Sequence, residues 1–254
     1  MGGRARHFRK RVRARERLVG TFVKLSTWSV VELLGETGLD FVVIDAEHAP
    51  LGRNEVDGLL LAARSVDLPA IVRISSADPD AAKQALDCGA NGILVPQVTD
   101  AAQAEACVAM VRYRQGRGYS NSPRIGRFGL TPLDELVDRA DEETVLLCQI
   151  ESRAAVAAAA AISAVQGMDG IMIGPADLAL SLEARSPHDP VVRTNIEAAL
   201  RDAGDAPKGL LLGRDTDCGP YGAAGATLFV IGSDVALLRD GAANVARAFA
   251  RTGG

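Results

Sequence analysis

Short apolar runs rich in Val, Ile and Leu recur along the chain and alternate with segments that have helical spacing. The runs show no polar alternation, which is typical of parallel strands buried on both faces. Helices are predicted between them, for example over Ala81–Cys88, Ala101–Arg112 and Val235–Ala250, each preceded by an aspartate that can cap it. Eight strands are predicted, over Val19–Leu25, Phe41–Asp45, Ala70–Ile74, Gly92–Pro96, Val145–Glu151, Gly170–Gly174, Gly209–Gly213 and Thr227–Gly232.

Eight alternating β and α units in 254 residues predict one α/β domain over residues 1–254, a closed (β/α)8 TIM barrel. An open doubly wound sheet is the alternative. A short basic segment, Arg4–Arg17, precedes the first strand and is predicted to be an amphipathic helix. One interval breaks the rhythm, because the 48 residues between Pro96 and Val145 include Gly116–Gly129, a stretch without periodicity. Loops of this length usually have a function, so we expect it near the active site or at a subunit contact.

Composition narrows the function classes. The net charge of −4 gives no positive field that would hold a polyanion, so nucleic acid is not expected as a partner. No apolar run is long enough to span a membrane, since the alanine-rich run Ala154–Val165 is too short and reads as a packed helix. No apolar run of a secretory signal follows the basic segment, and the four cysteines form no CxxC pair. We therefore expect a cytoplasmic protein with reduced cysteines.

In barrels of this kind the active site lies at the carboxyl ends of the strands. Burying unpaired charges there is costly, so polar residues at these ends are expected to contact one another, a metal or a ligand. Seven residues meet this criterion: Asp45, Glu47, His48, Arg73, Gln149, Glu151 and Asp177.

Glu151 and Asp177 are the candidate metal ligands. Two carboxylates from neighbouring strand ends, with few His or Cys side chains nearby, suit Mg²⁺ or Mn²⁺. The alternative is that Glu151 pairs with Arg153 or Arg73. Asp177 also lies at the start of a predicted helix, where it could cap the helix and where backbone N–H groups could receive an anion.

His48 and Arg73 are the candidates for proton transfer and for substrate binding. His48 alone among the three histidines follows a predicted buried strand, which suits a general base, although a structural histidine is the alternative. The planar guanidinium of Arg73 suits a substrate carboxylate, and an ion pair with Asp45 or Asp87 is its alternative. No dinucleotide, Walker A or Ser-His-Asp signature is present. None of Lys10, Lys24, Lys83 and Lys208 is expected at a strand end, so a Schiff base is not predicted.

Six segments in order along the chain together resemble the HpcH/HpaI aldolase family, the class II pyruvate aldolases that act on 4-hydroxy-2-oxoheptanedioate, 2-dehydro-3-deoxyglucarate and related 2-oxo acids. Each segment is modestly specific, but six in register are a specific pattern. The segments are Phe41–Pro50, Val72–Ile74, Leu86–Ala90, Val95–Val98, Gln149–Ser152 and Ile173–Leu178.

The resemblance implies a metal-dependent aldolase, a carbon–carbon lyase that cleaves or forms 4-hydroxy-2-oxo acids through a pyruvate enolate, with an aldehyde as the second substrate. Glu151 and Asp177 would ligate Mg²⁺, Mn²⁺ or Co²⁺. By the same resemblance, pyruvate would be bound by Arg73, Gln149, Gly174 and Ala176. His48, assisted by Asp87, would transfer a proton. Asp45 would position Arg73, and Glu47 would position metal-bound water.

The resemblance also implies a homohexamer in which the C-terminal helix, Val235–Phe249, is exchanged between barrels, with trimer and dimer as further possibilities. Three segments depart from the family pattern, so the aldehyde side of the site is expected to differ: Arg114–Gly118, Glu183–His188 and Gly213–Cys218. The alternatives are an oxaloacetate-type decarboxylase, a CoA-ester lyase related to citrate lyase β-chains, and a barrel without catalytic activity.

Overall fold

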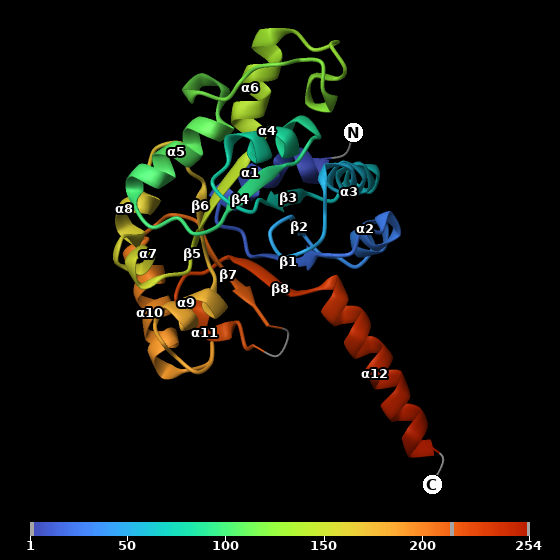
Figure 1. Ribbon diagram of the computed structural model, residues 1–254, viewed down its shortest axis with the longest axis vertical. Helices are drawn as coiled ribbons and strands as arrows, with labels where there is room; N and C mark the ends of the chain where they lie inside the picture. The colour runs from blue at the N-terminus through green and yellow to red at the C-terminus, as the bar shows by residue number, and fades with distance from the viewer. Residues whose placement is uncertain (1–2, 214–215, 253–254) are drawn as a thin grey trace.

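The computed structural model describes residues 3–213 and 216–252, and it confirms the closed eight-stranded barrel (Figure 1). All strand pairs are parallel, and β1 closes the ring by pairing with β8. Each expected strand is present, with ends that differ from the prediction by at most two residues. The strands are β1 (Leu18–Val23), β2 (Phe41–Asp45), β3 (Ala70–Arg73), β4 (Gly92–Val95), β5 (Val145–Ile150), β6 (Gly170–Ile173), β7 (Lys208–Leu212) and β8 (Leu228–Ser233).

Helices surround the barrel. Aspartates cap two of the expected helices: Asp78, two residues before Asp80, accepts from Asp80 N, and Asp100 accepts from Gln103 N. The alanine-rich run is two short helices instead of one, because the backbone at Ala158 leaves the helical conformation. The helices are α1 (Gly3–Arg13), α2 (Trp28–Gly35), α3 (Arg53–Ser65), α4 (Pro79–Asp87), α5 (Ala101–Val111), α6 (Leu133–Glu143), α7 (Arg153–Ala157), α8 (Ala159–Ser163), α9 (Pro175–Ser181), α10 (Pro190–Asp202), α11 (Gly219–Ala223) and α12 (Asp234–Thr252), with 3₁₀ turns η1 (Tyr113–Gln115) and η2 (Arg124–Gly126).

The expected N-terminal helix, α1, closes the end of the barrel at which the strands begin. Its residues Phe8 and Val12 are buried in the same apolar cluster as Phe41 and the other inward-facing strand residues, and the rings of Phe8 and Phe41 are 5.3 Å apart. Beside them, the carboxylate of Asp169 accepts from Arg9 Nε at 2.7 Å and from Arg112 Nη2 at 2.6 Å. Because this end is packed, the polar site is confined to the opposite end.

Helix α12 extends away from the barrel (Figure 1). It presents apolar side chains to solvent, among them Leu238, which is 66% exposed, and Val245, which is 71% exposed. Unpacked apolar surface of this kind usually marks a contact with another molecule. Within residues 3–213 and 216–252, no helix combines the length and apolar character that crossing a membrane requires.

Candidate active site

The inward-facing positions of the first three strands continue from apolar into charged side chains at the open end of the barrel. Inside the barrel, Phe22, Val43 and Ile71 belong to one apolar cluster. Two residues further along each chain segment lie Lys24, Asp45 and Arg73. Asp45 is in register with Arg73, and Ile44 with Val23, so the three residues occupy one level of the barrel. The result is a row of cation, anion and cation.

Asp45 is fully buried and is held by Arg73 through two hydrogen bonds. Arg73 Nε donates to Oδ1 at 3.0 Å and Nη2 donates to Oδ2 at 2.8 Å. Burial opposes the charge of Asp45, but the hydrogen bonds from Arg73 and Lys24 outweigh it and lower its pKa to about 2. The guanidinium also stacks over the ring of Phe22 at 4.5 Å. Of the two ion-pair partners considered for Arg73, the structure therefore shows Asp45 and not Asp87.

Lys24 directly follows β1, so the expectation that no lysine lies at a strand end was wrong. The predicted strand continued to Leu25, which hid this position. The Lys24 ammonium lies 2.9 Å from Asp45 Oδ2. A signal was present, because Lys24 continues the inward-facing series Leu18, Gly20 and Phe22.

Glu47 and His48 follow β2 at the rim of the same end. Glu47 Oε2 lies 3.3 Å from Arg73 Nε and 3.6 Å from His48 Nε2, yet it has no hydrogen-bond partner. Burial, with the neighbouring charges of Asp45 and Asp177, raises the pKa of Glu47. The His48 side chain is 55% exposed, so it can meet a ligand that enters the open end.

Glu151 follows β5 and is buried. Its Oε1 accepts from the backbone N–H of Gln97 at 2.6 Å, and its Oε2 accepts from the side chain of Gln149. Burial, and then the charges of Asp177 and Glu47, raise the pKa of Glu151. Arg73 forms its ion pairs with Asp45 and Glu47 instead of Glu151. The structure therefore does not show the Glu151–Arg73 pair that was one alternative to metal binding.

Gln97 is a site residue that the sequence prediction missed. Its φ of 58° is left-handed, which is uncommon for a residue other than glycine, and this conformation accompanies its N–H bond to Glu151. The signal was Pro96, because a proline ends the strand and turns the chain at that point.

Gly174 and Asp177 complete this side of the site from β6 and α9. A Cβ atom at Gly174 would lie 3.0 Å from both Gln149 Nε2 and Glu151 Oε2, so only glycine leaves the space beside these groups open. Gly174 is the N-cap residue of α9, and Asp177 lies in the first turn, where its side chain is not the cap. Asp177 and Ala176 are exposed.

The oxygen donors around Glu151 fit a hard divalent cation. The charges of Asp177 and Glu47 raise the pKa of Glu151, and the buried Oε1 of Gln149 has no hydrogen-bond partner. Within the described residues, no group of three or more His, Cys, Asp or Glu side chains is arranged to hold a metal by itself. A cation at Glu151 and Asp177 would therefore take its remaining ligands from water and substrate.

Asp87 does not join this site within the chain. It is the last residue of α4, and its carboxylate accepts from Arg117 Nη2 at 2.8 Å. The described contacts of His48 are with Glu47 and Asp45, so the expected His48–Asp87 pair is not formed here.

The long loop contacts outer helices. Arg117 pairs with Asp87 on α4, and Arg124 pairs with Asp57 on α3 at 2.7 Å. Its described ion pairs therefore do not reach the open end of this barrel, and its role as a subunit contact remains a prediction. Part of another departure, Arg214–Asp215, lies outside the described residues.

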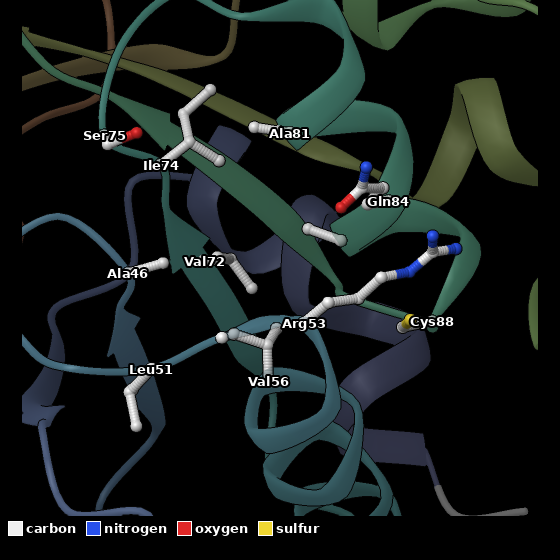
Figure 2. Close-up of a pocket in the computed structure, with 12 residues that line it drawn as sticks. Ala46, Leu51, Arg53, Val56, Val72, Ile74, Ser75, Ala81, Gln84 and Cys88 are labelled. Atoms are coloured by element: carbon white, nitrogen blue, oxygen red, sulfur yellow. The ribbon is translucent and has the colours of Figure 1, made fainter.

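A cavity of about 130 Å³ lies between β3 and the helices α3 and α4 (Figure 2). Its lining includes Leu51, Val56, Val72 and Ile74. Val72 and Ile74 alternate with Arg73 and so face away from the barrel interior. The cavity is therefore separate from the charged row.

Comparison with known proteins agrees with the barrel fold. The family model for HpcH/HpaI aldolase/citrate lyase matches residues 18–241. A pyruvate aldolase of Rhizobium etli is 36% identical over 96% of this chain and 97% of its own, and a hydroxypyruvate/pyruvate aldolase of Pseudomonas aeruginosa is 36% identical over 91% and 88%. The crystal structure of an HpcH/HpaI aldolase/citrate lyase family protein from Burkholderia cenocepacia superposes with a TM-score of 0.90, at 28% identity, over 96% of this chain and 99% of the other.

Proposed function

The chain belongs to the HpcH/HpaI aldolase/citrate lyase family, and on that premise we propose that it is a divalent-metal-dependent aldolase. Its reaction would be the cleavage or formation of 4-hydroxy-2-oxo acids, with pyruvate as the nucleophile and an aldehyde as the acceptor. The observation that carries the proposal is the buried carboxylate of Glu151. It lies beside Gly174, and the neighbouring charges of Asp177 and Glu47 raise its pKa. One similar protein named as a pyruvate aldolase and another named as a hydroxypyruvate/pyruvate aldolase support the choice of nucleophile.

Glu151 and Asp177 would hold the cation, which would be Mg²⁺, Mn²⁺ or Co²⁺. When bound, the cation would supply Lewis acidity to the keto oxygen and stabilise the enolate. Gln149 and Gln97 fix the orientation of Glu151 by hydrogen bonds to its two oxygens. Gly174 keeps the adjoining space free, and the backbone around Gly174 and Ala176 would border the pyruvate.

Arg73 would orient the carboxylate of the 2-oxo acid, because Asp45 holds its guanidinium in one orientation. In cleavage, His48 would accept the proton of the C4 hydroxyl while the C3–C4 bond breaks. The electron pair of that bond remains on C3 as the enolate, and the C4 fragment leaves as the aldehyde. Protonation of C3 then yields pyruvate.

Two other enzymatic activities and one non-catalytic role remain for the same fold. Oxaloacetate decarboxylation needs only the enolate half of the site and is compatible with it as a side reaction. A CoA-ester lyase would need a nucleotide-binding surface. A binding subunit without catalytic activity would not require the two carboxylates of Glu151 and Asp177. Product analysis with oxaloacetate, a 4-hydroxy-2-oxo acid and a CoA ester separates these possibilities.

The exposed apolar side chains of α12 support a homo-oligomer in which this helix packs on another copy. A hexamer is the assembly that the resemblance favours.

The test of the function is exchange of the methyl protons of pyruvate for deuterium in D₂O, followed by NMR. Metal-stripped protein should show no exchange, and addition of Mn²⁺ or Mg²⁺ should restore it. Absence of exchange with metal demonstrably bound would reject pyruvate as the nucleophile. Because exchange requires no acceptor, the result does not depend on the identity of the aldehyde.

A further inference from the structure

We infer that Lys24 determines acceptor specificity by binding an anionic group of the acceptor aldehyde, an inference that rests on the function proposed above. Lys24 lies in the inward-facing series of β1, at the level of Asp45 and Arg73. Its ammonium is an ion-pair partner of Asp45 at 2.9 Å, and its side chain is 29% exposed. It therefore faces the open end of the barrel as a partly solvated cation.

The position of Lys24 is fixed on both sides. The buried carboxylate of Asp234 accepts from the backbone N–H of Lys24 at 3.0 Å and from that of Leu25 at 3.0 Å. The ring of Phe22 lies below the ammonium at 5.6 Å. A cation held in place in this way binds an anion with a smaller loss of side-chain entropy than a free surface lysine would.

Asp45 does not need Lys24 for its own hydrogen bonds. Arg73 alone gives it two, and the backbone N–H groups of Glu47 and His48 also point to Oδ1. Arg73 is 5% exposed and has two of its three nitrogens directed at Asp45. Lys24 has three N–H donors, and in the described part of the chain its ammonium has one carboxylate partner. Lys24 therefore has more capacity than Arg73 to bind a further anion.

The strand order places Lys24 away from the proposed metal ligands. In the ring of eight strands, β1 is four positions from β5, which precedes Glu151, and three from β6, which precedes Asp177. A substrate with its keto group near Glu151 and its carboxylate at Arg73, as proposed above, would have its acceptor end extend over the β1 side of the open end. The charge at its far end would then meet Lys24, and the chemical class that fits is an aldehyde carrying a carboxylate.

The experiment compares kcat/KM for two two-carbon acceptors, anionic glyoxylate and neutral glycolaldehyde, with pyruvate as the nucleophile. In Lys24→Met the glyoxylate-to-glycolaldehyde ratio should fall roughly tenfold, as expected for loss of one charge-assisted hydrogen bond. Lys24→Arg should recover most of the ratio. The matched control is Lys83→Met, because Lys83 pairs with Asp80 on the exposed face of α4 and should leave the ratio unchanged.

Two results would overturn the inference. The first is an unchanged ratio in Lys24→Met. The second is an equal loss for both acceptors, which would make Lys24 a structural partner of Asp45. Pyruvate deuterium exchange by the wild-type protein reports the proposed function separately. If the wild type exchanges and the ratio does not move, only the Lys24 inference fails; if the wild type does not exchange, the proposed function fails and the inference with it.

Discussion

Arg73 donates two hydrogen bonds to the buried carboxylate of Asp45, at 3.0 Å from Nε and 2.8 Å from Nη2, and the two residues are register partners on β2 and β3. The pair fixes the plane of the guanidinium at the open end of the barrel. Because both groups are buried, the pair determines the geometry of the site and also how stability depends on pH.

Replacing Asp45 by Asn tests that dependence. The folded pKa of about 2 lies below the ordinary value of 3.8, so the ionised carboxylate stabilises the folded state above pH 4, and this contribution is lost as the pH falls toward 2. Asp45→Asn should lower the free energy of unfolding at pH 7. The difference from wild type should narrow by about 2 kcal/mol as the pH falls from 5 through 2. Urea unfolding followed by circular dichroism measures this, and a difference that is constant with pH would contradict it.

Removal of either candidate metal ligand should abolish metal-dependent turnover. Glu151→Gln and Asp177→Asn each leave a neutral amide in place of a carboxylate, which binds a hard cation weakly. Pyruvate exchange should fall by at least a hundredfold, and isothermal titration with Mn²⁺ should show weakened binding. Glu105→Gln, on the exposed face of α5, is the matched control. Full pyruvate exchange in both variants would show that Glu151 and Asp177 do not bind the metal.

His48→Ala should impair aldol cleavage more than it impairs enolisation, because the proposed proton transfer involves the C4 hydroxyl and not the methyl group of pyruvate. The two rates come from a cleavage assay with a 4-hydroxy-2-oxo acid and from pyruvate deuterium exchange. His7→Ala changes an exposed histidine on α1, at the closed end of the barrel, and serves as the control. An equal loss of both reactions, with metal still bound, would reject this role for His48.

Substituting the apolar surface of α12 should change the assembly. Leu238→Asp and Val245→Asp place a charge on the face that is proposed to pack on another copy, where an unpaired buried charge is costly. Sedimentation should show a smaller oligomer than wild type. Val191→Asp, at an exposed position of α10, should leave the mass unchanged. An unaltered mass in both α12 variants would exclude this helix from the interface.

Asp169 supports the closed end of the barrel, away from the site. It is buried and accepts from Arg9 on α1, from Arg112 and from the backbone N–H of Leu146. Asp169→Asn leaves two buried guanidinium groups without their carboxylate and should lower the free energy of unfolding by roughly 3 kcal/mol. Pyruvate exchange below the unfolding transition should persist. Loss of exchange in a variant that remains folded would contradict the separation of the two ends.

The sequence by itself determined the barrel, because eight continuous apolar runs spaced by helices have few other ways to bury their surface. It also located most of the charged strand ends, since a polar residue after an apolar run is conspicuous. The tertiary structure decided which of these residues meet. The register of β1 on β2, with both side chains facing inward, places Lys24 beside Asp45. The turn at Gln97 directs a backbone N–H to Glu151. The structure also paired Asp87 with Arg117 rather than His48. Such contacts depend on one-residue differences in where a strand ends and on helix direction, and apolar periodicity does not specify either of these.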